Sequence, residues 1–487
     1  MPSATTPDTH SAYDLKTLGS LGISDQDLAL TAQRSWHTPR QLQLALALTC
    51  VATLLFFVSV EVGTAQYHYA IKTVGHDSAP SIVMAEQIKA GLADMDADVA
   101  NELIAHPGQN KASLAAYEGS RKQVTDSLVS AAENITYGDA ERIPIRTIEE
   151  GLGVYEADVA QARVFHKRGG DPAVLPSYHQ ATVVMHTVLL PAADALDKAN
   201  NDMLTRVYAQ QQTECGCVLA LIWFTGLLLL AALVAAQIFL FKRMRRVINP
   251  LLAVATLLSV GFLIFTSATF HEESIHLKVA KEDSFDSVYA LWHARAIAYD
   301  ANAAESRWLL DPGYQSESAV QFFTGIGQLA TFGPGETYDS MANLASRAHA
   351  ISGNWTSQVP SDFHGYIADE MRNITFSGEK EDVVTTVRAL GAYVAVDSQM
   401  RQLEAVGRHG DAIALCVGDN PGQSDWAFTQ FDNALGSIID LNQQQFELAV
   451  SRGDDELAPI TLLTPLVSIA IAALALFGVL PRLREYS

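Results

Sequence analysis

Four long runs of apolar residues without a charged side chain divide the chain. These runs cover residues 41–60, 217–241, 251–270 and 458–481. A helix that crosses a bilayer needs about 20 apolar residues, so each run is long enough to do so. A buried helix of a soluble protein is the alternative for any single run. Four runs in one chain favour transmembrane helices, separated by two large polar segments, 61–214 and 271–457.

The first polar segment has apolar residues at three- and four-residue steps, the spacing of helices that pack along their length. The pattern predicts helices over 82–104, 114–135, 148–165 and 178–207. Short breaks separate them and contain the expected stop residues, among them Pro107-Gly108, Gly138 and Gly169-Gly170. Four consecutive helices with short connections predict an up-down four-helix bundle.

The second polar segment follows the same plan less regularly. Helices are predicted near 284–310, 382–406 and 426–449, while the stretches 331–337 and 352–363 interrupt the middle. The second helix of this segment is therefore expected to be broken. The predicted fold class is an all-α membrane protein with four transmembrane helices and two four-helix-bundle domains outside the membrane.

One short acidic segment occurs twice. "MDADVANELIAHPG" ends at Gly108, and "YDANAAESRWLLDPG" ends at Gly313, and each follows an apolar run at a similar distance. Internal duplication of a span–domain–span unit is the simplest account. We expect each copy to form the first helix of its bundle, with Pro-Gly as the turn, and its acids to keep an outer face in water.

Charge sets the expected orientation. The net charge of −22 makes nucleic acid a poor partner. Basic residues flank the apolar runs at 1–40, 242–250 and 482–487, and these rims are expected in the cytoplasm, with both chain termini. The segments 61–214 and 271–457 hold 21 acidic against 12 basic and 28 acidic against 11 basic residues, and are expected outside a bacterial cytoplasmic membrane. Forty polar residues precede the first run, which is therefore read as a retained anchor.

The paired spans around each helical segment resemble the sensory modules of bacterial chemoreceptors and sensor kinases. Two such modules in tandem, with the "MDADVANEL"/"YDANAAESR" repeat and the stretch "FDNALGSIIDLNQQQF" at 431–446, resemble the GlnX-type membrane proteins of actinobacteria. The resemblance implies that an extracytoplasmic small-molecule signal, associated with a glutamate/aspartate-binding lipoprotein, passes to a cytosolic Ser/Thr kinase. It implies no ligand-binding residues.

Motifs for chemistry are missing from the sequence. It has no phosphate loop, no His-Glu-x-x-His and no Gly-x-Ser-x-Gly, so we expect neither an enzyme nor a cofactor nor a metal centre. The apolar runs lack charged residues at mid-depth, which disfavours transport. Asn134, Asn354 and Asn373 each begin an Asn-x-Thr sequence, which implies glycosylation only in a eukaryotic secretory pathway.

Polar residues on otherwise apolar helical stripes are the best candidates for a ligand site. They are Arg121, Arg295, Asn302, Glu305 and Asn442. Burying such groups is costly unless they are paired. One reading is a pocket in which an arginine holds a carboxylate in bidentate fashion. Buried ion pairs such as Arg295–Glu305, an asparagine that sets helix register, and an arginine extending from the stripe edge stay open as alternatives.

With no catalytic set, the sequence predicts a protein that binds and relays. It would detect a small molecule, such as an amino acid, directly or through a solute-binding protein. A separate cytosolic protein would read the signal at the hairpin formed by Lys242, Arg243, Arg245 and Arg246, whose alternative role is contact with lipid headgroups. The rival function is a non-catalytic scaffold or accessory subunit for another envelope protein. A homodimer stays open.

Overall fold

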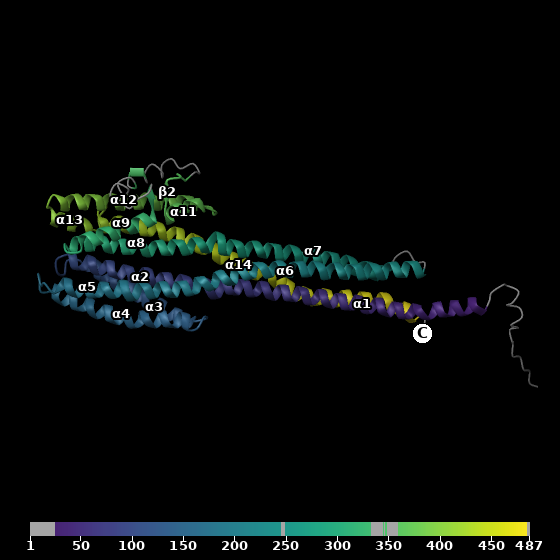
Figure 1. Ribbon diagram of the computed structural model, residues 1–487. Helices are drawn as coiled ribbons and strands as arrows, with labels where there is room; N and C mark the ends of the chain where they lie inside the picture. Colours follow the sequence, from purple (N-terminus) through teal and green to yellow (C-terminus); the bar gives the residue numbers. More distant parts are fainter. Residues whose placement is uncertain (1–24, 245–248, 333–343, 345, 348–358, 485–487) are drawn as a thin grey trace, which may run out of the picture. The chain divides into compact units, whose positions relative to one another are not determined.

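The computed structural model describes residues 25–244, 249–332, 344, 346–347 and 359–484. Almost all of the described chain is helical (Figure 1). Four stretches, each within one or more consecutive helices, are long and apolar enough to cross a membrane: Arg40–Ile104, Val174–Lys242, Pro250–Leu310 and Ser424–Pro481. They contain the four predicted runs. By Cα proximity the chain forms two compact units.

The first unit contains the described parts of Met1–Ala65, Cys215–Phe270 and Ala458–Ser487. Its helical segments belong to α1 (Asp25–Ile71), α6 (Leu190–Met244), α7 (Pro250–Lys278) and α14 (Ser424–Arg484). Large apolar side chains are exposed on it, for example Leu257 at 73% and Leu462 at 70%. Side chains of this kind suit a surface in contact with lipid rather than water.

Small and hydroxylated residues bring the helices of this unit together. The Thr225 hydroxyl donates to Ser59 Oγ at 3.1 Å, and Asn249 Nδ2 donates to the Gly478 carbonyl at 2.7 Å. A Cβ added at Gly226 would lie 2.8 Å from Leu263 Cδ1, closer than a real carbon atom approaches. Close contacts at small residues and hydrogen bonds between helices are typical of helix packing in membranes.

The second unit comprises Gln66–Glu214 and His271–Leu457. Its N-terminal helical group consists of α2 (Ala79–Ile104), α3 (Lys111–Glu133), α4 (Asp139–His166), α5 (Val174–Val184) and the beginning of α6. A π-helix, Met185–Leu189, joins α5 to α6. These helices enclose an apolar cluster that includes Tyr117, Tyr155 and Tyr178. The four predicted helices of this segment and their turns are thus confirmed, and Gly108 and Gly138 adopt positive φ.

The C-terminal helical group of the same unit is more elaborate. Its elements are α8 (Asp286–Leu310), α9 (Gln315–Leu329), β1 (Thr331–Phe332), β2 (Phe363–His364), α11 (Tyr366–Arg372), α12 (Glu379–Ala405), α13 (His409–Cys416) and the first part of α14. The strands β1 and β2 pair antiparallel, which the helical pattern did not predict. The helix is broken as predicted, because α9 ends at Leu329 and α11 begins only at Tyr366. Most of the two interrupting stretches lies outside the described residues.

The two repeated segments pack against each other. In Figure 1, α2 and α8 run side by side, and side-chain bonds join Asp96 of α2 to Arg307 of α8, and Asn101 of α2 to Ser306 of α8. No residue of α2 is exposed. The prediction that the repeated acids face water is therefore wrong for α2, because Asp96 and Asp98 lie at 1% and 8% exposure between helices.

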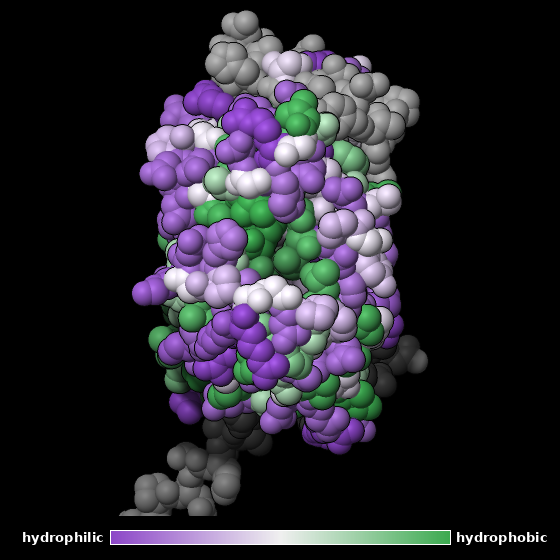
Figure 2. All heavy atoms as spheres, turned by 90° about the vertical axis from the view of Figure 1, so that its left-hand side faces the viewer, coloured by the Kyte–Doolittle hydropathy of each residue, from purple (hydrophilic) through white to green (hydrophobic). Residues whose placement is uncertain are grey.

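At the ends of the helices, α2, α8, α12 and α13 share a small apolar cluster. It consists of Ile104, Leu309, Met400, Ala412 and Cys416. Figure 2 views this end and shows hydrophobic side chains gathered around a hollow near the centre of the face. Contacts of this kind tie the end of the N-terminal helical group to the C-terminal one.

Candidate functional site

A cavity of about 500 Å³ lies between α5 with its π-helix on one side and α8 with α9 on the other. Its walls therefore come from both helical groups of the second unit. Buried Tyr178, Arg307 and Asp311 line it, and the exposed side chains of Val183 and Tyr314 lie among its other lining residues. Pockets that hold small molecules commonly have volumes of about 300–1,000 Å³.

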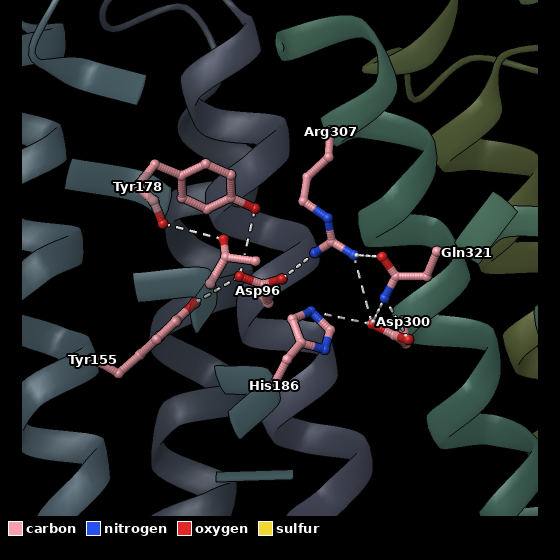
Figure 3. A network of polar contacts seen from close by, with 8 residues as sticks. Asp96, Tyr155, Tyr178, His186, Asp300, Arg307 and Gln321 are labelled. Carbon is pink, nitrogen blue, oxygen red and sulfur yellow. Dashed lines mark hydrogen bonds and ion pairs between the residues drawn. The ribbon is translucent and has the colours of Figure 1, made fainter. Parts of the chain in front are cut away.

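Arg307 is the centre of a polar network at the cavity wall (Figure 3). Its guanidinium is 8% exposed and donates through Nη1 to Asp96 Oδ2. Nη2 donates to Gln321 Oε1 at 3.0 Å and lies 3.6 Å from Asp300 Oδ1. Burial alone would lower the pKa of Arg307, but Asp96 raises it overall, so this arginine stays charged.

Asp96 receives hydrogen bonds from the opposite side as well. The hydroxyl groups of Tyr155 on α4 and Tyr178 on α5 donate to its Oδ1 at 3.4 and 3.5 Å. Burial, followed by the nearby Asp96 charge, raises the pKa of both tyrosines, which keeps them as neutral donors. A single carboxylate thus connects α2, α4, α5 and α8.

Two histidines lie beside carboxylates around the cavity. His179 Nε2 contacts Asp311 Oδ2, and its ring packs edge-on against Tyr314 with centroids 4.4 Å apart. His186 Nε2 is 3.8 Å from Asp300 Oδ1, beyond hydrogen-bond distance, and makes no hydrogen bond to a described residue. Asp300 in turn accepts both of its bonds from Gln321 Nε2, at 3.0 and 2.9 Å.

The repeated sequence segment was the signal that could have located this network. Asp96 and Asp300 occupy matching positions in the two copies, and both approach Arg307. The repeat was recognisable in the sequence, but its acidic residues were predicted to lie on a solvent-exposed surface. Arg307 and the two histidines escaped notice, because nothing in a helical pattern shows that α5 faces α9 across a gap.

Of the five predicted site residues, Arg121 does not lie in a buried seam. Its side chain is 42% exposed and pairs with Glu118 at 3.0 Å and Glu156 at 3.6 Å. Tyr117 and Val124 carry the buried stripe of α3, and Arg121 lies at its edge, as the third alternative proposed. It lines a different groove, of about 420 Å³, between α3 and α4.

Arg295 forms an ion pair, but not with the predicted partner. It binds Asp432 of α14 in bidentate fashion, through Nε at 2.7 Å and Nη2 at 2.6 Å. An Arg295–Glu305 pair is wrong, because ten residues along one helix separate the two by about 15 Å.

Asn302, Glu305 and Asn442 are all buried, as predicted, and have protein partners. Asn302 Nδ2 donates to the Tyr393 hydroxyl at 3.3 Å, which donates to Glu305 Oε2 at 3.2 Å. Asn442 Nδ2 donates to Glu379 Oε1 at 2.9 Å. Neither group lines the cavity at Arg307, and nothing in these contacts identifies a ligand.

Of the basic hairpin residues, Lys242 is exposed at the end of α6. Arg243 belongs to the same helix, and Arg245 and Arg246 lie outside the described residues. Within the described ranges, no group of three His, Cys, Asp or Glu side chains is arranged to hold a metal ion.

Two of the three Asn-x-Thr sequences form matching turns. Asn134 Nδ2 donates to Ser81 Oγ at 2.8 Å, and Asn373 Nδ2 donates to Ser287 Oγ at 3.0 Å. After each asparagine, two backbone N–H groups bind one buried glutamate, Glu141 in the first turn and Glu379 in the second. These asparagines therefore act as turn anchors, a role missed at the sequence level. Asn354 lies outside the described residues.

The four long apolar helices are consistent with a membrane protein. A model of the family described as an actinobacterial sensor domain matches residues 70–209, which is well under half of the chain. The matched region contains Asp96, Tyr155, Tyr178, His179 and His186 of the network, but not Arg307. This match indicates a role in sensing or signalling. No curated protein and no solved structure matches the chain.

Proposed function

We propose that this chain is a transmembrane sensor that detects a small molecule outside the cytoplasmic membrane. The observation that carries the proposal is the 500 Å³ cavity between the two helical groups, one wall of which belongs to the region matched by the sensor family. In this proposal both groups are extracytoplasmic helical bundles derived from one duplicated unit. The matching turns at Asn134 and Asn373 support that duplication.

The position of the cavity suggests how occupancy would be converted into a conformational signal. A ligand between α5 and α9 would contact residues bonded to Arg307, and Arg307 is tied to Asp96 in the other helical group. A ligand shifts an equilibrium only when it binds one arrangement better than another. Separation or closure of α5 and α8 would supply two such arrangements.

The relay in this proposal runs through helices that have residues in both units. α1, α6, α7 and α14 each continue from the second unit into an apolar run. The termini and the basic hairpin would be cytoplasmic, where a separate protein such as a Ser/Thr kinase would read the change. The resemblance to GlnX-type proteins is the basis for naming a kinase, and a binding lipoprotein would be the route for an amino acid signal.

The test uses the full chain in lipid nanodiscs and its melting temperature against a broad panel of amino acids, amines, carboxylates and sugars. A ligand that binds only the folded state raises the melting temperature. Val183→Trp places a bulky ring at the cavity from a position that is 58% exposed, and should abolish the shift. Val164→Trp, at 52% exposure on α4, is the matched control and should retain it.

Hydrogen exchange tests the relay with the same sample. A compound that raises the melting temperature should alter amide protection at the distant ends of α6 and α7, around Lys242 and Pro250. An unchanged exchange pattern there, with the cavity occupied, would show that binding is not transmitted. A panel in which no compound shifts the melting temperature would remove the sensor proposal.

A scaffold function is supported by a different feature, the groove of about 420 Å³ between α3 and α4. Apolar side chains including Leu128, Val129 and Ile145 line it together with Arg121. Val129 is 52% exposed, so Val129→Glu should leave folding intact while blocking an envelope partner at this groove. Loss of a co-purifying membrane protein in this variant, without any small-molecule response, would favour the scaffold.

A further inference from the structure

The guanidinium of Arg307 at the cavity wall already has partners within the protein. Arg307 is the only arginine or lysine among the cavity-lining residues, all of which are described. Asp96 binds its Nη1, Gln321 binds its Nη2, and Asp300 lies 3.6 Å from the latter. A carboxylate ligand would therefore have to displace these partners from a guanidinium that is almost completely buried. Displacing a buried partner leaves an uncompensated charge and is strongly unfavourable.

Negative charge, in contrast, is present in excess around the cavity. Asp311 and Glu317 line it, and Asp96 and Asp300 stand behind Arg307. Four carboxylates and one guanidinium thus lie in the lining or just behind it, with two histidines whose charge depends on protonation. A cluster of one sign in a concave site attracts ligands of the opposite sign.

Of the two carboxylates that line the cavity, Asp311 is buried and Glu317 is exposed. Asp311 is 7% exposed and is held by His179 and by the Gly313 N–H, at 2.9 Å for the latter. Glu317 is exposed on the first turn of α9. Tyr314, which is 51% exposed, also lines the cavity, and the face of an aromatic ring attracts cations. Among the lining groups, these two carboxylates and the Tyr314 ring are therefore the ones that would attract a cation.

We propose that the cavity binds a positively charged amine, with its ammonium group held between Asp311 and Glu317 beside the Tyr314 ring. The proposal rests on the proposed function, because it names the ligand class of the same site. It replaces the sequence-based reading in which an arginine holds a ligand carboxylate. Arg307 instead positions Asp96, Asp300 and Gln321 and keeps the wall intact.

The experiment compares matched probes on the full chain in nanodiscs at constant ionic strength. Cadaverine and L-lysine are the cationic probes, succinate is the anionic probe and L-glutamine carries no net charge. We expect the cationic probes to raise the melting temperature and succinate to leave it unchanged. Glu317→Gln should weaken apparent cadaverine binding by roughly tenfold, the scale of a hydrogen bond to a charged group. Glu133→Gln, another exposed glutamate, should bind as the native chain does.

The outcomes separate the ligand class from the function. A shift with succinate or with other uncharged or anionic compounds, lost in Val183→Trp, would keep the cavity as the sensing site and overturn the amine class. A cadaverine shift that survives both Glu317→Gln and Val183→Trp would place amine binding elsewhere and also overturn the proposal. The absence of a shift with every compound of the wider panel would remove the sensing function, and the ligand class with it.

Discussion

Gln66 and Glu273 hold corresponding places in the two halves of the chain, but of the two side chains only that of Gln66 is hydrogen-bonded to described residues. Each lies six residues before a π-helix, Lys72–Ser78 in the first half and Val279–Phe285 in the second. Gln66 Nε2 donates to Gln211 Oε1 at 3.0 Å and also contacts Glu214. Glu273 is completely buried, and neither carboxylate oxygen has a hydrogen-bond partner among the described residues.

This difference predicts a stability change with pH. Burial, and then the charges of Glu456 and Asp454, raises the pKa of Glu273 to about 8. The folded state therefore holds a proton that the unfolded state has lost above its ordinary pKa of 4.5. Stability falls as pH rises from about 4.5 to about 8, by on the order of 3 kcal/mol once solvent screening is allowed for.

Glu273→Gln should remove this contribution. We expect the variant to melt at a higher temperature than the native chain at pH 8.5 and at a similar temperature at pH 5. Gln66→Glu, the reciprocal change, should add a second loss of stability with rising pH, because the new carboxylate would lie beside Glu214. Parallel melting curves for native chain and Glu273→Gln across this range would show that the carboxylate has a partner or water that neutralises it.

The Asp96–Arg307 ion pair should show strong coupling in a double-mutant cycle. Asp96→Asn leaves a buried guanidinium with less compensation, and Arg307→Gln does the same to Asp96, so each single change should cost about 3–5 kcal/mol. The double variant should cost clearly less than the two single changes together. Additive effects on unfolding would show that the two residues do not stabilise each other.

The glutamates of the two Asn-Ile-Thr turns should contribute equally. Glu141 Oε2 accepts from the N–H groups of Thr136 and Tyr137 at 2.7 and 2.6 Å, and Glu379 Oε2 accepts in the same way at 2.8 and 3.0 Å. Glu141→Gln and Glu379→Gln should each destabilise the chain by about 1–3 kcal/mol, because charge-assisted bonds become neutral ones. Glu133→Gln serves as the exposed control, and an equal effect there would contradict the prediction.

Gly75 lies in the first π-helix, where a neighbouring helix comes too close for a side chain. A Cβ at this position would lie 2.6 Å from Val450 Cγ1 and 2.8 Å from Cγ2. Gly75→Ala should therefore lower stability by about 1–3 kcal/mol through overpacking. Val450→Ala in the same chain should recover part of the loss. A Gly75→Ala variant as stable as the native chain would show that the Val450 side chain can adopt another rotamer and avoid the overlap.

Much of the secondary structure was predictable because its determinants are local. The apolar spacing around Tyr117 and Val124 and the stop at Gly138 act within a few residues of the chain, and helix and turn appear there. The burial of Asn302, Glu305 and Asn442 followed from their stripe positions. Arg121 failed this test. It lies four residues after buried Tyr117 and is turned from it by about 40°, which is enough to put a long side chain at the edge of the stripe.

The candidate site depended on tertiary packing that periodicity does not encode. Whether α2 faces water or α8 is decided by residues distant in the sequence, and Asp96 becomes a buried partner only when Arg307 is opposite. The two-stranded pairing of Phe332 with Phe363 is also a long-range event. The sequence contained one further indication of the matching turns. Asn-Ile-Thr occurs at 134–136 and again at 373–375, with an aromatic residue after each copy.

The enclosed position of α2 has an evolutionary consequence. Residues joined across α2 and α8 stand as far as 211 positions apart in the chain. A charge change in one of them would leave its buried partner uncompensated. The two halves should therefore not change independently, and exchange of either for the half of a relative should create mismatched partners. Inheritance should therefore keep the two halves together as a single recombination unit, even where their surfaces diverge.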